Sequence, residues 1–186
     1  RSHVDISFEE DPSGIEIDKG KFRISENGLD KIEFLISTNP GEPLKSLAKI
    51  VSGGEASRIM LALKSIMAKL DNIPCLIFDE IDAGIGGRTA QIVGEKLSRI
   101  GLNHQILCVT HSPQIASLGD THFLIKKLTS KGETYTRILE LNNSERVKEL
   151  ARMLGGAEIT DNTLNHAREM LNLAKTTKKH LKVIYN

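Results

Sequence analysis

Val51-Ser52-Gly53-Gly54-Glu55 opens the stretch that decides the fold, followed by Cys75-Leu76-Ile77-Phe78-Asp79-Glu80 and then by Thr110-His111. Each piece meets a different need of phosphoryl transfer: backbone amides for a terminal phosphate, carboxylates for Mg²⁺ and water, and an imidazole near the developing charge. A phosphate-binding loop of the form Gly-x-x-x-x-Gly-Lys-Ser/Thr would complete such a site, and no stretch of this chain fits it. The order of the pieces therefore predicts the downstream half of an ATP-hydrolysing site.

The carboxylates and the histidine are expected at one edge of a parallel sheet. Residues 75–78 form a short apolar run typical of a strand buried on both faces, and residues 106–109 form a second. Between them, residues 87–100 predict a helix whose buried stripe is Ala90, Val93, Leu97 and Ile100. A strand, a helix and a parallel strand make a right-handed crossover, which brings Asp79-Glu80 and Thr110-His111 to the carboxyl edge.

Periodicity assigns the remaining segments. Alternating apolar residues and turn signals over 4–43 predict an antiparallel strand layer with one face in water. Residues 53–70 predict a helix that buries Met60, Leu63, Met67 and Leu70, with Ser57, Arg58 and Lys64 pointing elsewhere. The later segments are a short helix at 112–118, a hairpin over 123–141 around Ser130-Lys131-Gly132, helices near 144–153 and 161–175, and a solvated basic tail of Lys175, Lys178, Lys179 and Lys182.

Length favours one domain. A chain of 186 residues with 39% hydrophobic content can bury a substantial core, and it is too short for two comfortable domains. We expect a single domain over 1–186. Its parts are a possible cloning scar at 1–3, the strand layer at 4–43, the core with the three motifs at 44–141, and the C-terminal helices and basic tail at 142–186.

Net charge and the two cysteines bear on the partners and on the cellular location of the protein. Lys and Arg total 25 against 24 Asp and Glu, so the net charge of +1 gives no global reason to expect a polyanionic partner. Cys75 and Cys108 lie in apolar runs, and the chain shows neither a signal peptide nor an apolar stretch of about 18 residues. These features favour buried free thiols, a cytoplasmic location and no membrane partner; a disulfide between neighbouring strands is the alternative.

Ser52, Gly53, Gly54 and Glu55 form a candidate anion site at the start of a helix. The first amides of a helix have no internal partner, and the helix dipole adds partial positive charge there. Glycines let a phosphate approach the backbone. The alternative is structural, with Ser52 as an N-cap and the glycines in a turn; the acidic motif downstream favours the phosphate site.

Asp79, Glu80 and His111 are the candidate catalytic and metal-binding residues. Two adjacent carboxylates after a buried strand are costly unless a cation or substrate uses them. We expect Asp79 to hold Mg²⁺ through its water shell and Glu80 to orient and deprotonate the attacking water. His111 would contact the terminal phosphate. The alternatives are turn-forming carboxylates and a structural histidine, whereas the other histidines lack the spacing of a zinc site.

The motifs resemble those of ABC ATPases: residues 51–55 the signature, residues 75–80 Walker B with its catalytic glutamate, and Thr110-His111-Ser112 the switch histidine. Glu80-Ile81-Asp82-Ala83 is similar to the SMC-type branch. More narrowly, the segments 34–42, 52–58 and 79–87 resemble the RecN family of bacterial DNA repair proteins, over about residues 4–174. Position 51 is Val where signatures commonly carry Leu, and Gly86 stands where many D-loops carry an aspartate.

The resemblance implies the fold and the partners. The fold is α/β, the C-terminal lobe of an ABC/SMC-type P-loop NTPase head, with a mostly parallel sheet flanked by helices and an N-terminal antiparallel strand layer. It further implies ATP and Mg²⁺ as cofactors, and an N-terminal lobe that carries the phosphate-binding loop. A second head would pair with the first, so that Ser52, Gly53 and Gly54 close the partner's nucleotide site in trans.

The biology that the resemblance implies is recombinational repair of DNA double-strand breaks, with DNA as a partner and association with the nucleoid. This chain alone is expected to be inactive. The alternatives are a head lobe of another SMC-type chromosome-organising ATPase and a non-catalytic regulatory lobe that binds a partner ATPase.

Overall fold

The chain forms two compact units, Arg1–Ser52 and Gly53–Asn186, in the computed structural model. The structure describes residues 1–18, 20–37, 41–49, 53–67, 73–130, 133–156 and 158–185. The strands of the first unit pair among themselves, as do those of the second. The chain's own contacts therefore give two units, and a single domain over 1–186 stays a prediction.

The first unit is the expected antiparallel layer. Its longest pairing joins β1 (Ser2–Phe8) to β4 (Asp30–Ile36), with Val4 opposite Phe34 and Ile6 opposite Ile32. The apolar side chains alternate as predicted. However, Ile6 and Phe34 are more than half exposed, so both faces of the layer are accessible to solvent, whereas one exposed face was predicted. Further elements are β2 (Glu10–Ile17) paired with β3 (Gly20–Phe22), β5 (Lys45–Ser46) on the edge of β4, and a 3₁₀ turn at Leu47–Lys49.

The second unit contains the predicted crossover. β6 (Cys75–Phe78), α2 (Gly87–Ile100) and β7 (Gln105–Cys108) follow one another, and β6 and β7 pair in parallel with Phe78 opposite Cys108. The predicted stripe of α2 is confirmed, because all four of its members are buried in one core. That core consists of Leu61, Phe78, Ile81, Ala90, Val93, Leu97, Ile100 and Ile115.

Among the described strands only β6 and β7 pair in parallel, and other residues cover one face of this pair. Leu76 and Ile106 pack against the core. On the other face Ile77 is 71% exposed, and Leu107 and Val109 are about half exposed. The prediction that residues 75–78 are covered on both faces is therefore wrong for this chain, because nothing among the described residues covers the second face. The other described strand pairings are all antiparallel.

Helix α1 (Gly53–Met67) forms as predicted, but it buries a different face. Gly54 and Leu61 are its buried residues, whereas Met60, Leu63 and Met67 are each more than 40% exposed. The predicted buried stripe is therefore wrong, because α1 packs through the face of Gly54 and Leu61 and nothing among the described residues covers the face of Met60, Leu63 and Met67. Leu70 lies outside the described residues.

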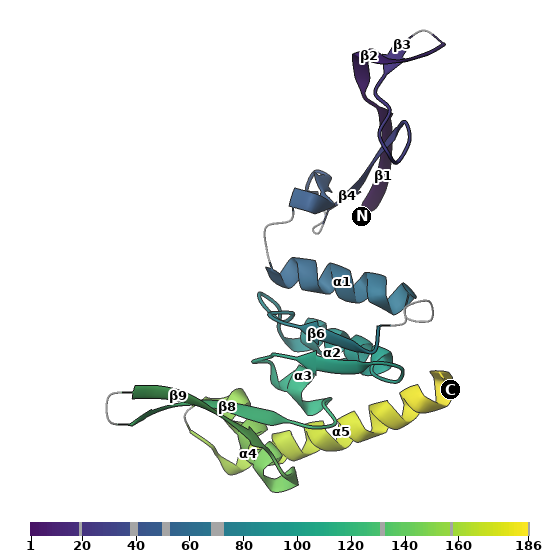
Figure 1. Cartoon of the computed structure of the whole chain (residues 1–186). Helices are drawn as coiled ribbons and strands as arrows, with labels where there is room; N and C mark the ends of the chain where they lie inside the picture. The colour runs from purple at the N-terminus through teal and green to yellow at the C-terminus, as the bar shows by residue number, and fades with distance from the viewer. Residues whose placement is uncertain are drawn as a thin grey trace. The chain divides into compact units, whose positions relative to one another are not determined.

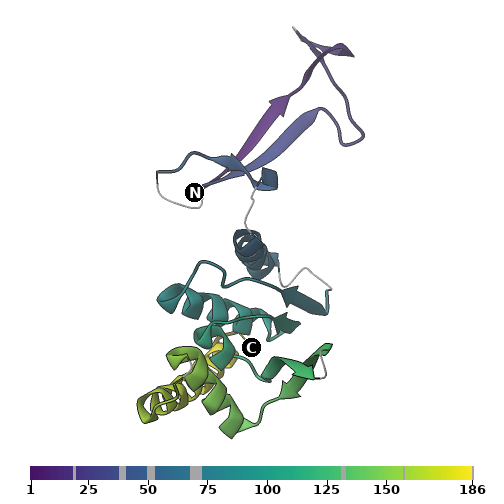
Figure 2. The same cartoon turned by 90° about the vertical axis from the view of Figure 1, so that its left-hand side faces the viewer.

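The C-terminal elements extend further than predicted. A short helix α3 (Pro113–Ser117) leads to the hairpin of β8 (Phe123–Ser130) and β9 (Glu133–Glu140), whose expected turn residues 131–132 lie outside the described part. Helix α4 (Asn143–Gly155) begins with a capping box between Asn142 and Glu145. It packs against α5 (Asp161–Tyr185), as Figures 1 and 2 show.

The basic tail is part of α5 rather than a separate solvated segment. Figure 1 shows α5 as one rod that continues to the C-terminus. Lys178 lies 2.6 Å from the Asp120 carboxylate and is only 21% exposed, so for this lysine the prediction of a solvated tail is wrong. None of the described helices, α5 included, has the length and apolar character needed to cross a lipid bilayer.

Leu150→Ala tests the packing of α4 on α5. The Leu150 side chain is fully buried beside Ala151 and Ala167, so its truncation leaves a cavity. We expect a loss of about 2–5 kcal/mol in the free energy of unfolding, measured by urea titration. Leu173→Ala, the same change at an exposed position of α5, is the control and should stay within about 0.5 kcal/mol of the parent. Equal losses at both positions would contradict this core.

Candidate functional site

Asp79 and Glu80 follow the last residue of β6, at the carboxyl edge of the parallel pair, and both are exposed. Glu80 has a φ of 55°, in the left-handed region that residues with a side chain seldom adopt. This conformation costs roughly 1–2 kcal/mol and persists only where the surroundings fix it. The backbone at Glu80 is therefore held in a specific direction.

The loop of residues 79–83 is fastened to α1. Ser57 Oγ donates to the Asp79 carbonyl at 3.0 Å. Arg58 Nη1 donates to the carbonyls of Ile81 and Ala83 at 3.2 and 2.9 Å. The expectation that Ser57 and Arg58 point away from the packed face is thus wrong, because their donors satisfy loop carbonyls that no strand pairs with.

Gly54 brings the backbone of α1 close to the same loop. A Cβ at this position would lie 2.9 Å from both the Ala83 Cβ and the Glu80 carbonyl oxygen. A Cβ at Gly53 would lie 3.1 Å from Glu80 Oε2, so the carboxylate is beside the first turn of α1. The first turn offers unpaired amides and the positive end of the helix dipole, which favour negative charge.

The structure thus brings three of the predicted site residues together within one chain: Gly53, Gly54 and Glu80. Glu55 belongs to the first turn of α1. Ser52 and Val51 lie outside the described residues. Glu80 Oε2 therefore lies beside the first turn of α1, where the positive end of the helix dipole favours a negative charge.

Asp82 connects this loop to the histidine turn. Its side chain is 1% exposed. Asp82 Oδ2 accepts from Thr110 Oγ1 at 2.5 Å, from the His111 amide at 2.9 Å and from the Ser112 amide at 3.0 Å. Because Phe78 is opposite Cys108 in the parallel pair, the predicted proximity of residues 110–111 to residues 79–80 is confirmed, and Asp82 links the two loops by hydrogen bonds.

Hydrogen bonds keep Asp82 ionised. Burial by itself would raise the pKa of this carboxyl, but the hydrogen bonds from the Thr110 hydroxyl and the His111 amide lower the pKa below its usual value. The charge of Asp82 is thus present at neutral pH inside the protein. The sequence names Asp82 as part of a motif, but gives no sign that it is buried.

His111 projects from this turn into solvent. Its side chain is 80% exposed, and its Nδ1 lies 3.3 Å from Asp82 Oδ2. The outer side of the imidazole is accessible to a ligand. Glu80 and His111 are therefore an exposed carboxylate and an exposed imidazole on neighbouring loops that Asp82 ties together.

The donor set limits where a divalent cation could bind. No group of three or more His, Cys, Asp or Glu side chains gathers as a metal site in the described part of the chain. Asp82 is committed to three donors, which leaves the exposed carboxylates of Asp79 and Glu80. Mg²⁺ commonly uses one or two carboxylates together with water and substrate phosphates, and a carboxylate at this edge fits that coordination.

Cys75 and Cys108 are free thiols at opposite ends of the parallel pair. Cys75 is opposite Gln105, and Cys108 is opposite Phe78, three positions along the strand. Strands rise by about 3.3 Å per residue, so the two Cα atoms are too far apart for a disulfide. The expectation of free thiols agrees with this register.

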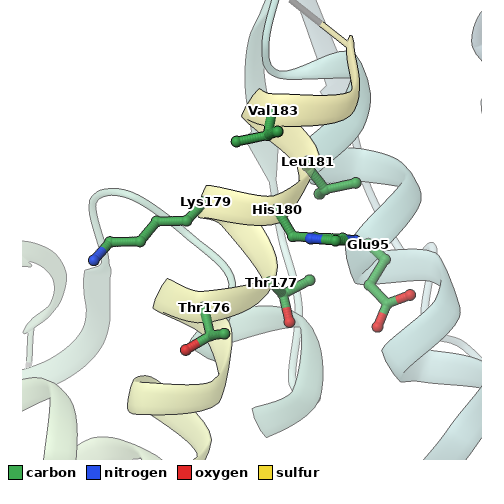
Figure 3. Close-up of a pocket in the computed structure, with 7 residues that line it drawn as sticks. All are labelled: Glu95, Thr176, Thr177, Lys179, His180, Leu181 and Val183. Carbon is green, nitrogen blue, oxygen red and sulfur yellow. The ribbon is translucent and has the colours of Figure 1, made fainter.

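A hollow beside α2 is separate from this site. It has a volume of about 570 Å³ and lies between α2 and the C-terminal part of α5. Figure 3 shows the His180 ring extending from α5 toward Glu95 of α2. Its lining residues are Glu95, Thr176, Thr177, Lys179, His180, Leu181 and Val183, and none of the predicted site residues is among them.

The curated proteins to which this chain is similar include several that share one name, DNA repair protein RecN. The chain is 48% identical to DNA repair protein RecN of Bacillus subtilis over 156 residues, which is 84% of this chain and 27% of that protein. The identity is 46% to RecN of Vibrio cholerae over 92% of this chain and 31% of the relative, and 38% to RecN of Streptomyces coelicolor over 95% and 32%. The chain thus spans about a third or less of the length of these relatives. No family model matches it.

Solved structures show a weaker likeness. An SMC ATPase structure described as concerning ATP-driven dimerization and DNA stimulated activation aligns over 73% of this chain and 81% of its own, at 22% identity and a TM-score of 0.45. An SMC head bound to the C-winged helix domain of ScpA aligns over 75% and 38%, with a TM-score of 0.44. Both scores are below 0.5, so the description of the fold rests on the elements and pairings themselves.

The ordered motifs, joined at one edge of a parallel pair, are those by which the chain resembles the C-terminal lobe of SMC-like ABC ATPase heads. Within that class the chain belongs to the RecN family, and it corresponds to the C-terminal part of the relatives.

Gly54→Ala tests the close approach of α1 to the loop. The added Cβ would press on the Ala83 Cβ and on backbone at Glu80, so we expect a loss of about 1–3 kcal/mol in unfolding free energy despite the higher helix propensity of alanine. The matched control is Gly53→Ala, whose Cβ meets only a movable carboxylate oxygen. Urea titration of both variants decides; a Gly54 variant as stable as the Gly53 variant would rule out the approach.

Cys108 should alkylate slowly. Burial, followed by the charges of Asp82 and Asp79, raises the pKa of its thiol to about 12. At pH 8 its thiolate fraction is then on the order of 10⁻⁴, so iodoacetamide should label Cys75 at least about tenfold faster. Peptide mass spectrometry measures both sites, and labelling in urea, which should abolish the difference, is the control. Equal rates in the folded chain would show that Cys108 is not shielded.

Proposed function

We propose that this chain is the C-terminal half of an ATPase head that acts in recombinational repair of DNA double-strand breaks. The observation that carries the proposal is the junction at Asp82, which holds the His111 turn against the loop of Asp79 and Glu80. The name of the relatives, DNA repair protein, supports the biological setting. DNA as a partner and a cytoplasmic location at the nucleoid belong to the same proposal.

The residues divide the work of hydrolysis between them. Glu80, held in its left-handed conformation, orients the attacking water and accepts its proton. Asp79 would hold Mg²⁺ through its water shell, and the ion would supply positive charge that neutralises the phosphates. The exposed imidazole of His111 contacts the terminal phosphate of ATP from the neighbouring loop.

The N-terminal lobe of the same protein is the proposed cover for the open face of the parallel pair. Ile77, Leu107 and Val109 form an apolar surface there, and parallel sheets are stable when both faces are covered. The relatives are about three times as long as this chain, so they contain the additional sequence that such a lobe needs. The phosphate-binding loop, which this sequence lacks, would come from that lobe.

A second head completes the proposal. Gly53, Gly54 and Glu55 begin α1, and with Ser52 before them in the sequence they are the proposed anion-binding element of a chain whose sequence has no phosphate-binding loop. In a homodimer of heads, this element would close the nucleotide site of the partner. ATP binding would then drive head dimerisation, and hydrolysis would release it.

Two other functions can be distinguished from the proposed one. A head lobe of another SMC-type chromosome organiser is less well supported, because the relatives described above are RecN proteins. A non-catalytic regulatory lobe would bind a partner ATPase without using Glu80. Reconstitution separates this alternative from the proposal.

ATP turnover should require both lobes and Glu80. We expect no turnover by this chain alone, turnover after mixing with the N-terminal head segment of the same gene, and a loss of at least about 100-fold on Glu80→Gln. Glu158→Gln, an exposed carboxylate before α5, is the control and should retain activity. Phosphate release is measured with and without DNA.

Two outcomes of this experiment would contradict the proposal. A mixture that binds but stays inert would favour the regulatory lobe. Turnover by the isolated chain that disappears with Glu80→Gln would contradict the two-lobe arrangement.

A further inference from the structure

Helix α5 separates its apolar and its basic residues onto different faces. Ala167 and Ala174 are buried on the face that packs against the rest of the unit. Beside that face runs a row of exposed donors, spaced three or four residues apart, so that they are neighbours on the helix surface. This row, the basic stripe, consists of Arg168, Asn172, Lys175, Lys179 and Lys182.

The basic stripe repels itself. Lys175 and Lys179 are four residues apart and Lys179 and Lys182 are three apart, and like charges at these spacings destabilise a helix. None of these lysines forms an ion pair with a carboxylate of the described residues. Figure 3 shows the Lys179 side chain extending away from Glu95 of α2. The helix dipole favours cations in the last turn, which includes Lys182 but not Arg168 or Lys175. An anion from outside the chain would therefore relieve a repulsion that the helix itself does not compensate.

A hollow continues the basic stripe toward α4. It has a volume of about 640 Å³ and lies between the start of α4, the turn of residues 117–120 and α5. Its only acidic lining residue is Asp120, which is already 2.6 Å from Lys178 Nζ. Arg146 directs its Nη donors at backbone carbonyls of the same turn. The positive charge of the hollow therefore exceeds its negative charge, with cations from Arg146, Arg168, Lys175 and Lys178.

We propose that the basic stripe and this hollow bind the sugar-phosphate backbone of duplex DNA without reading its sequence. Lys, Arg and Asn side chains are common donors to phosphate oxygens. From Arg168 to Lys182 the stripe is about 21 Å long, the length of about six base pairs at about 3.4 Å each. A regular line of donors of this length suits a polyanion with regularly repeated charges better than a single phosphate group.

The composition of the basic stripe favours a duplex over a single strand. Proteins that bind single strands stack bases on aromatic side chains, and no member of the stripe is aromatic. An acidic protein surface is the competing partner. The choice of DNA rests on the proposed function, whereas the positive charge and the spacing of the donors rest on α5 alone.

The test measures binding of the 186-residue chain to a fluorescein-labelled duplex of about 30 base pairs by fluorescence anisotropy, from about 50 to about 200 mM NaCl. The combined variant Lys175→Gln, Lys179→Gln and Lys182→Gln removes three charges and keeps residues of similar helix propensity. We expect its Kd to rise at least about tenfold at about 100 mM salt. The slope of log Kd against log salt should fall by about 3, because each phosphate contact contributes about 0.9.

The matched control changes three exposed lysines outside the basic stripe, Lys96→Gln, Lys126→Gln and Lys127→Gln. It lowers the formal net charge from +1 to −2, as the stripe variant does, and its Kd should stay within about threefold of the wild type. Equal losses in the two variants would show that net charge alone drives binding and would overturn the proposal.

Single changes keep the test decisive if the combined stripe variant does not fold, which circular dichroism monitors. Each Lys→Gln change in the stripe should lower the salt slope by about 1, whereas Lys→Arg at the same position keeps the charge and should bind like the wild type. Single variants that leave the slope unchanged would overturn the proposal.

The probes also separate the possible partners. Two duplexes of unrelated sequence should give Kd values within about twofold of each other, because phosphate contacts carry no sequence information. Polyglutamate that displaces the duplex at equal charge concentration would indicate an acidic protein partner and overturn the assignment to DNA. A wild-type chain that binds neither duplex would overturn it as well.

This proposal and the proposed function fail separately. A two-lobe head without ATP turnover would refute the proposed function, while the anisotropy of this chain would still show whether the basic stripe binds DNA. A head that hydrolyses ATP, together with a chain whose DNA binding does not depend on the stripe, would refute the stripe alone.

Discussion

One buried carboxylate oxygen organises the candidate site. Asp82 Oδ2 accepts three hydrogen bonds from the turn of residues 110–112, which follows β7, while Asp82 itself lies in the loop that follows β6. Removing any one partner would leave a charged or polar group buried without compensation, which costs more than an exposed hydrogen bond gains. The two loops therefore keep one relative arrangement, and the distance between Glu80 and His111 depends on it.

A second set of contacts holds the same loop from the other side. Arg58 satisfies two of its carbonyls, and Gly54 allows the start of α1 to approach its backbone. The loop after β6 is thus fixed between a helix and a turn, although it is at the surface and has no regular hydrogen-bonding pattern. This double attachment explains how the left-handed conformation of Glu80 is maintained.

The sequence predicts best those elements whose partners lie within the chain. The stripe of α2 is confirmed, since the strands and helices that cover it are all present. The stripe assigned to α1 is wrong, because helical spacing shows that a face is apolar and not which surface covers it. The burial of Asp82 could not be predicted, since its donors are 28 to 30 residues away and reach it only through the crossover. The role of Arg58 depends on loop carbonyls, which leave no sequence pattern.

The uncovered face of β6 and β7 has a consequence for synthesis. In a protein with the layout of the relatives, the segment described here is translated last, so the part that would cover Ile77 and Leu107 has already left the ribosome when these strands appear. With the proposed N-terminal lobe as that partner, the apolar surface would be covered as soon as it emerges. Translation order thus shortens the time during which an open strand pair could associate with other chains.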